Sequence, residues 1–430
     1  MLKRWFTAAA LLAAVPSLWA LEGKLIFTLA PNVSDEFAHI MPYRPPYVPT
    51  VSKCVRNQPV MLHLMLAKPA VDKDGKVLVE VESVKSIEPD GKFKELVEPG
   101  KPLVALQGVR KTDRDFYGVM LSNISLTITA EDTDPLGKTR MTVKLRDRSD
   151  GSVLELSGDM ELVENLPGAP EKPMTVKQMD DFFTKYYQSP APEKIPAAFA
   201  AFLRFDEENS GKKKAYDPLM WLCGFAELYK LNPQIRPALV KAAAEYSALH
   251  KQYVALILAE AGAEDADLKG ADPELMKLFA KFRGKKPLSF DTVTHPAQLD
   301  ALWVKFMVTG GVEPIRRLVN ELRKRDDVLT VDEVKKLGRK PTPEEFRKLM
   351  NDLIGRAAEW SLASNAKQHK LVAYYLEAML MRKQYPDRDA AVKLGGMLMN
   401  AGVLERAKTP EGKTILRSVV GKPRSETPER

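Results

Sequence analysis

One stretch divides the 430-residue chain in two: Asn165-Leu166-Pro167-Gly168-Ala169-Pro170-Glu171-Lys172-Pro173. Proline lacks a backbone donor and glycine weakens regular structure, so this stretch suits neither a sheet ladder nor a helix interior. Apolar residues recur at every second position before it and at every third or fourth position after it. We therefore predict a linker at 166–173, between a β-rich domain at 21–165 and an all-α domain at 174–404.

The part before the linker is predicted to form short antiparallel strands. Between Val77 and Val84, valines alternate with polar residues such as Glu80 and Glu82. Similar apolar patterns occur in the ranges 60–66, 124–128, 141–145 and 153–163. Turn signals such as Asp74-Gly75 separate these ranges. Period-two alternation with one polar face is typical of half-buried strands, and turns at short intervals favour an antiparallel β-sandwich.

The part after the linker carries repeated helix-start signals. Thr330 with Glu333, and Thr342 with Glu345, have the spacing of capping boxes. Such signals predict roughly nine helices of ordinary length. The start signals keep no fixed period, so we expect an irregular bundle or a short helical solenoid.

Three tryptophans and the C-terminus add to this picture. Trp221, Trp303 and Trp360 each lie on an apolar helix face, and we expect all three in the core. From Glu405 onward the chain is polar, and 405–430 is predicted to be a frayed tail.

The first twenty residues have the order of a secretory signal. The positive start Leu2–Arg4 is followed by the uncharged run Phe6–Trp19 and by the small residue Ala20. An uncleaved membrane anchor is the alternative. No later segment is apolar enough to cross a bilayer. We therefore expect a signal peptide at 1–20 and an exported mature chain, periplasmic or secreted, without a membrane span.

The residue types used in catalysis and metal binding form no recognisable motif. None of the five histidines has zinc-site spacing to another ligand; we expect His63 to be a hydrogen-bonded residue inside a strand and the other four to be surface or cap residues. The doublet Gly310-Gly311 belongs to no phosphate-binding loop and predicts a helix end or a close contact. Cys54 and Cys223 are either free thiols or an interdomain disulfide. No cofactor and no metal is expected.

Charge is divided unevenly between the two parts. Residues 22–165 hold 19 Lys and Arg against 22 Asp and Glu, a net charge of −3, whereas residues 166–430 hold 44 against 35, a net charge of +9. The basic part suits an acidic partner, and export argues against nucleic acid. Eight residues of a proline-rich strip at 42–49 and of a basic stretch are candidate partner-binding residues: Tyr43, Arg44, Tyr47, Arg316, Arg317, Arg323, Lys324 and Arg325. The alternatives are a loop covering a sheet edge for the strip and a solvated helix surface for the basic stretch.

Short passages of both parts resemble known proteins. Leu299–Gly311 and Ala357–His369 resemble uncharacterised bacterial helical proteins. The turn Asp134–Gly137 and the alternating strand after it resemble the immunoglobulin-like β-sandwich modules of exported bacterial proteins, although the Cys…Trp…Cys spacing of true immunoglobulin domains is absent. The resemblance implies an exported protein with an immunoglobulin-like sandwich followed by a helical domain, and it implies no activity.

These observations favour one functional class and leave two others open. We expect a non-enzymatic interaction or scaffold protein of the bacterial cell envelope, with an envelope protein or a glycan as its partner. One alternative is an envelope hydrolase acting on glycan or peptide, with a catalytic pair that only the fold assembles. The other is a protein that binds anionic lipid or acidic glycan through its basic helical half.

Overall fold

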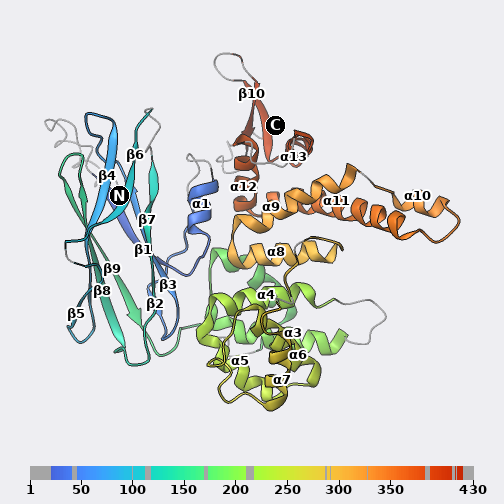
Figure 1. Cartoon of the computed structure of the whole chain (residues 1–430), viewed down its shortest axis with the longest axis horizontal. Helices are drawn as coiled ribbons and strands as arrows, with labels where there is room; N and C mark the ends of the chain where they lie inside the picture. The colour runs from blue at the N-terminus through green and yellow to red at the C-terminus, as the bar shows by residue number, and fades with distance from the viewer. Residues whose placement is uncertain are drawn as a thin grey trace, which may run out of the picture. The chain divides into compact units, whose positions relative to one another are not determined.

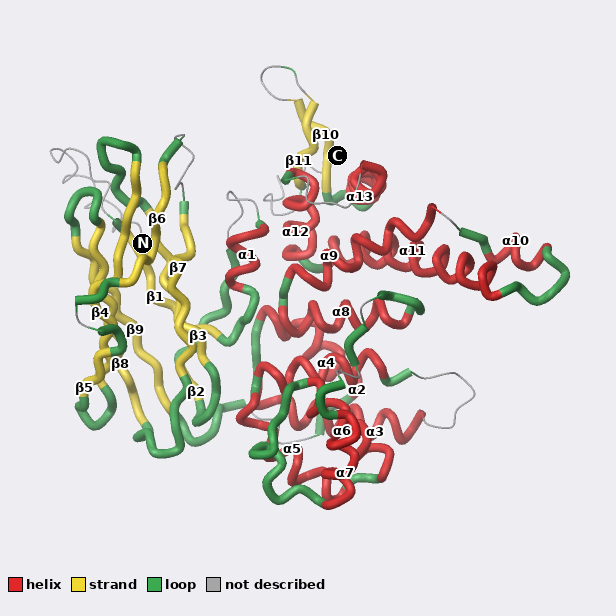
Figure 2. Tube along the Cα trace, viewed as in Figure 1, coloured by secondary structure: helices red, strands yellow, loops and turns green. Residues whose placement is uncertain are grey.

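The chain forms two compact units in the computed structural model. The structure describes residues 21–40, 46–98, 100–111, 118–168, 173–209, 217–285, 288–290, 292–326, 328–382, 388–408, 412 and 414–419. Within them, unit 1 comprises residues up to Phe27, 62–128 and 135–162, and unit 2 comprises 28–61, 129–134 and 163 onward. The predicted order is confirmed, because a β-rich region with antiparallel sheets precedes a helical region (Figures 1 and 2). The two units interleave in sequence, however, since 28–61 and 129–134 belong with the helices.

Unit 1 consists of two sheets. Its strands are β1 (Glu22–Thr28), β3 (Val60–Ala67), β4 (Lys76–Ile87), β5 (Phe93–Glu95), β6 (Leu103–Val109), β7 (Val119–Ile128), β8 (Gly137–Asp147) and β9 (Val153–Leu162). One sheet has the order β1-β3-β7, and the other contains β9-β8-β4-β5 with β6 also paired to β4. The pairs of β4 with β5, β6 and β8, and of β8 with β9, are antiparallel.

In β4, buried and less buried side chains alternate as the sequence predicts, up to a β-bulge. Val77, Val79 and Val81 are all buried. The register against β8 shifts between Val81 and Ser83, after which Val84 takes the buried position. An extra residue in one strand moves the following side chains to the opposite face, which explains the change. Gly158 of β9 lies where a Cβ would meet the Phe27 ring of β1 at 2.9 Å, so side chains of the two sheets face each other closely.

His63 is buried in β3 with only 2% of its surface exposed. Its predicted place inside a strand is confirmed, but the predicted hydrogen bonding is wrong, because neither ring nitrogen has a partner among the described residues. Burial without a partner lowers the pKa of the imidazole. His63 is therefore neutral in the folded protein near neutral pH.

Unit 2 contains all the α-helices of the described chain. They are α1 (Val33–His39), α2 (Val176–Lys185), α3 (Ile195–Asn209), α4 (Leu219–Leu231), α5 (Arg236–Ala242), α6 (Ala248–Glu260), α7 (Pro273–Phe282), α8 (Ala297–Thr309), α9 (Val312–Asn320), α10 (Val331–Lys336), α11 (Pro343–Gln368), α12 (Lys370–Met381) and α13 (Arg388–Asn400). Short 3-10 helices lie between them: η1 (Tyr186–Gln188), η2 (Pro192–Lys194), η3 (Pro233–Ile235), η4 (Ala243–Glu245) and η5 (Glu321–Asp326). The short strand β2 (Lys53–Cys54) also belongs to this unit.

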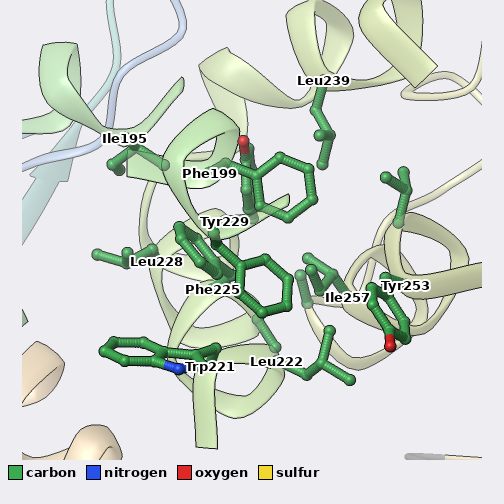
Figure 3. Packing of buried hydrophobic residues seen from close by; sticks show 14 of the residues in the cluster. Ile195, Phe199, Trp221, Leu222, Phe225, Leu228, Tyr229, Leu239, Tyr253 and Ile257 are labelled. Carbon is green, nitrogen blue, oxygen red and sulfur yellow. The ribbon is translucent and has the colours of Figure 1, made fainter. Parts of the chain in front are cut away.

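The helices pack around two clusters of buried apolar residues. The first joins α2 through α8 and is rich in aromatic rings (Figure 3). Phe225 packs edge-on against both Phe183 and Phe199. The second joins α8, α9, α11, α12 and α13, and it also includes Ile40, which directly follows α1. Burial of this much apolar surface supplies the main driving force for folding of the unit.

Trp360 overturns one expectation about the core. Trp221 and Trp303 are buried as predicted, but Trp360 is 73% exposed. α11 buries the face that carries Ile354 and Ala358. With 3.6 residues per turn, a residue six positions after Ile354 lies about 120° around the helix from it. The apolar pattern of α11 therefore covers a wider arc than the core does.

The C-terminal segment also differs from its prediction. In place of a frayed tail from Glu405, strands β10 (Leu404–Lys408) and β11 (Thr414–Ser418) pair in an antiparallel hairpin. The signal peptide predicted at 1–20 lies outside the described residues, and 166–168 and 173 of the predicted linker lie in neither helix nor strand. Among the described helices, none is both long and apolar enough to cross a membrane.

Candidate functional site

The first candidate site surrounds α1, a helix that the sequence analysis did not predict. Its seven residues lie between β1 and β3 in sequence, yet they belong to unit 2. Asp35 and Glu36 stand in its first turn and His39 in its last, which suits the helix dipole. A helix of two turns inside a strand-rich region shows too little periodicity to be recognised, and these first-turn acids were the available signal.

The N-terminal end of α1 caps another helix of unit 2. The N-cap of α9 is Gly311, which has no side chain to bond the free backbone donors, and the Val312 N–H donates instead to Asp35 Oδ2 at 3.0 Å. Gly310 ends α8 with φ +64°, and a Cβ there would lie 2.7 Å from the amide nitrogen of Asn32. The doublet thus marks a helix end and a close contact, as predicted.

Glu36 is the most strongly perturbed carboxyl group of this site. It is 4% exposed, its Oε1 accepts from Asn32 Nδ2 at 2.8 Å, and its Oε2 accepts from the Tyr47 N–H at 3.0 Å. Burial raises its pKa to about 7, although the two hydrogen bonds oppose the shift. A proton is therefore exchanged at Glu36 near neutral pH.

The C-terminal end of α1 is held by cations and by an apolar side chain. Arg382 donates to the backbone carbonyls of Ala38 and Ile40, groups that the helix itself leaves without partners. Arg316 of α9 contacts His39 Nε2 at 3.2 Å. Since Ile40 is buried in the second core cluster, both ends of α1 are fixed to the helices.

Two buried tyrosines, Tyr187 and Tyr375, are close enough to Glu36 to feel its negative charge, and Tyr187 contacts a histidine. The Tyr187 hydroxyl lies 3.1 Å from His369 Nδ1, and Tyr375 donates to the Gly310 carbonyl at 3.0 Å. Burial raises the pKa of Tyr187 to about 12, with a smaller contribution from the negative charge of Glu36, and burial lowers the pKa of His369. His369 is 4% exposed and stands as the C-cap of α11 and the N-cap of α12, so its predicted cap position is confirmed, and it is buried as well.

A second buried cluster connects α3 with α6. His250 Nε2 lies 3.1 Å from Asp206 Oδ2, and the Tyr253 hydroxyl donates to Asp206 Oδ1 at 3.4 Å. His250 and Asp206 are 3% and 2% exposed, and His250 lies inside α6, so its prediction as a surface or cap residue is wrong. The tertiary structure buries both histidines by packing other helices over them, which periodicity within one helix cannot indicate.

The polar groups of these buried clusters bond to one another and hold chain segments in place. A carboxyl group with a pKa near 7 has the proton affinity of a general acid or base, but both oxygens of Glu36 are bonded to neighbouring protein groups. The Tyr187 hydroxyl likewise accepts from Gln188 Nε2 at 2.7 Å while it contacts His369. Such networks fix segments of chain in place and make their docking depend on protonation.

The second candidate site is the α10–α11 hairpin, defined here as residues 330–351. Both predicted capping boxes are confirmed: Thr330 and Thr342 accept from the backbone of Glu333 and Glu345, whose side chains bond back. Arg339 also donates to both oxygens of Glu345 at 2.7 Å. No side chain from Val331 to Asn351 is buried. In Figure 1, α10 and the first part of α11 extend beyond the other helices of unit 2.

Large apolar side chains are exposed along this hairpin and on the helix that continues it. Val331 is 41% exposed, Phe346 52% and Trp360 73%. Local capping and ion pairs therefore keep the hairpin helical without a core of its own. Sequence reasoning missed this surface because it assigned Trp360 to the core.

The structure places the eight predicted partner-binding residues in three regions. Tyr47 and Arg316 each contact α1, Tyr47 through Glu36 and Arg316 through His39. The Tyr47 hydroxyl also donates to the Gln188 carbonyl at 3.2 Å. Arg317 packs over the Phe290 ring, 5.0 Å from its centre, and donates to the Phe290 carbonyl. The other five either lie in η5 or fall outside the described residues: Arg323, Lys324 and Arg325 in η5, and Tyr43 and Arg44 outside.

Within the described part of the chain, no three His, Cys, Asp or Glu side chains are arranged to hold a metal ion. Cys54 and Cys223 are both buried free thiols. Burial raises the pKa of Cys54 to about 11 and of Cys223 to about 12. A thiol with so high a pKa is a poor nucleophile at neutral pH.

Comparison with known proteins gives no family. No protein-family model matches the chain, and no curated protein matches it. Among solved structures, the chain is similar to a family 123 glycoside hydrolase from Clostridium perfringens, studied for glycolipid glycan hydrolysis. The match has a TM-score of 0.21 and 10% identity, and it covers 44% of this chain and 36% of the hydrolase. A match with so low a TM-score supports no argument about the fold or the function of this chain.

Proposed function

We propose that this protein is a non-enzymatic interaction protein of the cell envelope and that the α10–α11 hairpin, with Trp360, is its partner-binding surface. One observation carries the proposal: Phe346 on the capped hairpin and Trp360 farther along α11 are 52% and 73% exposed. Exposed aromatic side chains on a preorganised helix are typical of binding surfaces, where tryptophan is enriched among the energetically dominant residues.

The buried titratable groups support a binding role over catalysis. The Glu36 and Asp206 clusters are each bonded internally and are at most 4% exposed at their central carboxyl groups. Export is supported by the signal-like order of the first twenty residues. The two facing sheets of unit 1 support an immunoglobulin-like sandwich, a fold that commonly presents binding surfaces.

Complex formation in an envelope extract tests the proposal. The wild-type chain is expected to shift into a larger species on native size-exclusion chromatography, and Trp360→Ala with Phe346→Ala is expected to abolish the shift. Because both side chains are largely exposed, the free energy of unfolding should change by less than about 1 kcal/mol. The matched control is Leu249→Ala with Met276→Ala, two side chains of α6 and α7 that are 45% and 41% exposed.

The same measurement separates the competing functions. If the hairpin variant and the control keep the shift equally, the hairpin is not the binding surface. If the wild-type chain forms no complex but cleaves an envelope glycan or peptide, the protein is a hydrolase and the proposal is wrong.

A further inference from the structure

Strand β3, the middle strand of the β1-β3-β7 sheet, carries two thioethers and an imidazole on one face. Its sequence includes Met61-Leu62-His63-Leu64-Met65. Successive side chains of a strand point to opposite faces, and the burial of β3 follows this alternation. One face is at most 3% exposed at each position, and it consists of Val60, Leu62, Leu64 and Leu66. Met61, His63 and Met65 therefore share the opposite face.

His63 stands in the middle of that face as a buried polar group. It is 2% exposed, whereas Met61 and Met65 are half-buried. Neither of its ring nitrogens has a hydrogen-bond partner among the described residues. Few buried polar groups in folded proteins lack a partner, and a bound ion is one reason for such a group. Burial also lowers the pKa of the imidazole, so at neutral pH one ring nitrogen offers the free lone pair that a metal ion needs.

The spacing along β3 brings both sulfur atoms within reach of an ion bound to His63. Residues two positions apart on a strand are separated by about 7 Å, and methionine is unbranched with three rotatable bonds. The thioether of Met61 can reach such an ion from one direction along the strand, and that of Met65 from the other. The partial exposure of both methionines gives the ion a route from solvent.

These ligand types select a soft ion. Thioether sulfur favours Cu(I), and imidazole is also a good ligand for copper. Strand β3 contains no Asp, Glu or Cys, so it offers neither the carboxylates that Ca²⁺ and Mg²⁺ prefer nor the thiolates common in structural zinc sites. The chemistry of the face therefore distinguishes Cu(I) from the common divalent ions.

We propose that Met61, His63 and Met65 of β3 form a binding site for Cu(I). The imidazole is the central ligand, and the two thioethers bind from either side of it. Binding gives a ring nitrogen of His63 a partner, which offsets the cost of burying that nitrogen unpaired. The site is separate from the α10–α11 hairpin, so this inference goes beyond the proposed function and does not depend on it.

Titration of the full chain with Cu(I) tests the site. The titration is done without oxygen, in competition with a coloured Cu(I) chelator, and one ion per chain is expected to bind. Ag(I), another soft monovalent ion, should compete for the site, whereas Zn(II) in about tenfold excess should not displace Cu(I). Because thiols also bind Cu(I), Cys54→Ala with Cys223→Ala is measured as well and should leave the affinity unchanged.

Leucine variants assign the binding to the two thioethers. Met61→Leu and Met65→Leu remove a sulfur atom but keep an apolar side chain of similar size. Each should weaken Cu(I) binding at least about tenfold, since even the loss of a group that only orients a metal ligand has an effect of this order. The matched control is Met141→Leu, a buried methionine of β8 in the other sheet, which should leave the affinity unchanged.

His63→Leu separates a metal ligand from a residue that only fills space. The substitution removes a buried polar group without a partner, so without metal the variant should unfold at a denaturant concentration at least as high as the wild-type chain. It should nevertheless lose Cu(I) binding. Cu(I) should therefore raise the Tm of the wild-type chain and leave that of the variant unchanged.

Several results would overturn the inference. They are no binding of Cu(I) to the full chain, unchanged affinity in both methionine variants, displacement of Cu(I) by Zn(II), or loss of binding when the two cysteines are replaced. An equal loss in Met141→Leu would attribute the effect to altered packing and would overturn it as well. Binding retained in His63→Leu would remove the imidazole from the site and refute the proposal in its stated form.

Discussion

α1 and the α10–α11 hairpin are both helical segments of unit 2, but different kinds of contact hold them in place. Contacts between residues far apart in sequence hold α1, whereas contacts between residues close in sequence hold the hairpin. α1 is fixed by contacts far apart in sequence: Asp35 bonds α9, Arg382 bonds the end of α1, and Ile40 enters a core. The hairpin is fixed by contacts within a few residues, its two capping boxes and its ion pairs. Long-range burial makes a segment structural, whereas local capping leaves a helical face available for binding.

The largest effect is expected from cutting the linker, which tests whether α1 is fixed to the helices of unit 2. A protease site placed at Leu166–Gly168 should be cut without separating the two halves, because residues 28–61 of the N-terminal half belong to unit 2. Native size-exclusion chromatography should show one particle after cleavage, and separation in denaturant should leave the C-terminal half without α1 and with reduced helical circular dichroism. Elution of two folded fragments under native conditions would show that α1 is dispensable.

Two glycines with the same left-handed backbone conformation allow the region around α1 to be compared with the hairpin. Gly310 beside α1 has φ +64° and Gly338 in the hairpin has φ +63°. A Cβ at Gly310 would meet Asn32 at 2.7 Å, whereas one at Gly338 meets nothing within 4 Å. Gly338→Ala should cost about 1 kcal/mol for the left-handed backbone, and Gly310→Ala about 4 kcal/mol because crowding is added. Equal losses in chemical denaturation would mean that Asn32 moves aside freely.

Glu36 makes the free energy of unfolding depend on pH. Its pKa is about 7 in the folded state against 4.5 for the free side chain, so the folded state binds the proton more tightly. The stabilisation is complete below pH 4.5 and is lost as pH rises through about 7, a change of about 3 kcal/mol. Glu36→Gln is neutral at every pH and should remove this loss, provided that Asn32 turns its amide to accept a hydrogen bond.

Denaturation curves at about pH 5 and about pH 8 measure the effect. Glu36→Gln should exceed the wild-type chain in free energy of unfolding at the higher pH and approach it at the lower. Glu344→Gln in the hairpin is the control, because an exposed ion pair contributes at most about 1 kcal/mol. A wild-type chain whose stability does not fall between these pH values would contradict the raised pKa.

The sequence allowed the local features to be predicted because nearby residues produce them. The alternation of β4 up to its bulge, the capping boxes at Thr330 and Thr342, and the helix end at Gly310 all depend on residues within a few positions. The burial of Trp221 and Trp303 also followed from apolar faces within single helices.

Only the tertiary structure decided what covers each face. It placed α1 and residues 28–61 with the helices, buried His250 and His369, and left Trp360 exposed. Each of these depends on a partner far away in sequence, such as Asp35 with Val312 or Tyr187 with His369. Periodicity states that a residue is on an apolar face, but the packing of other elements determines whether that face is filled, and this physical difference separates an anchor from a binding surface.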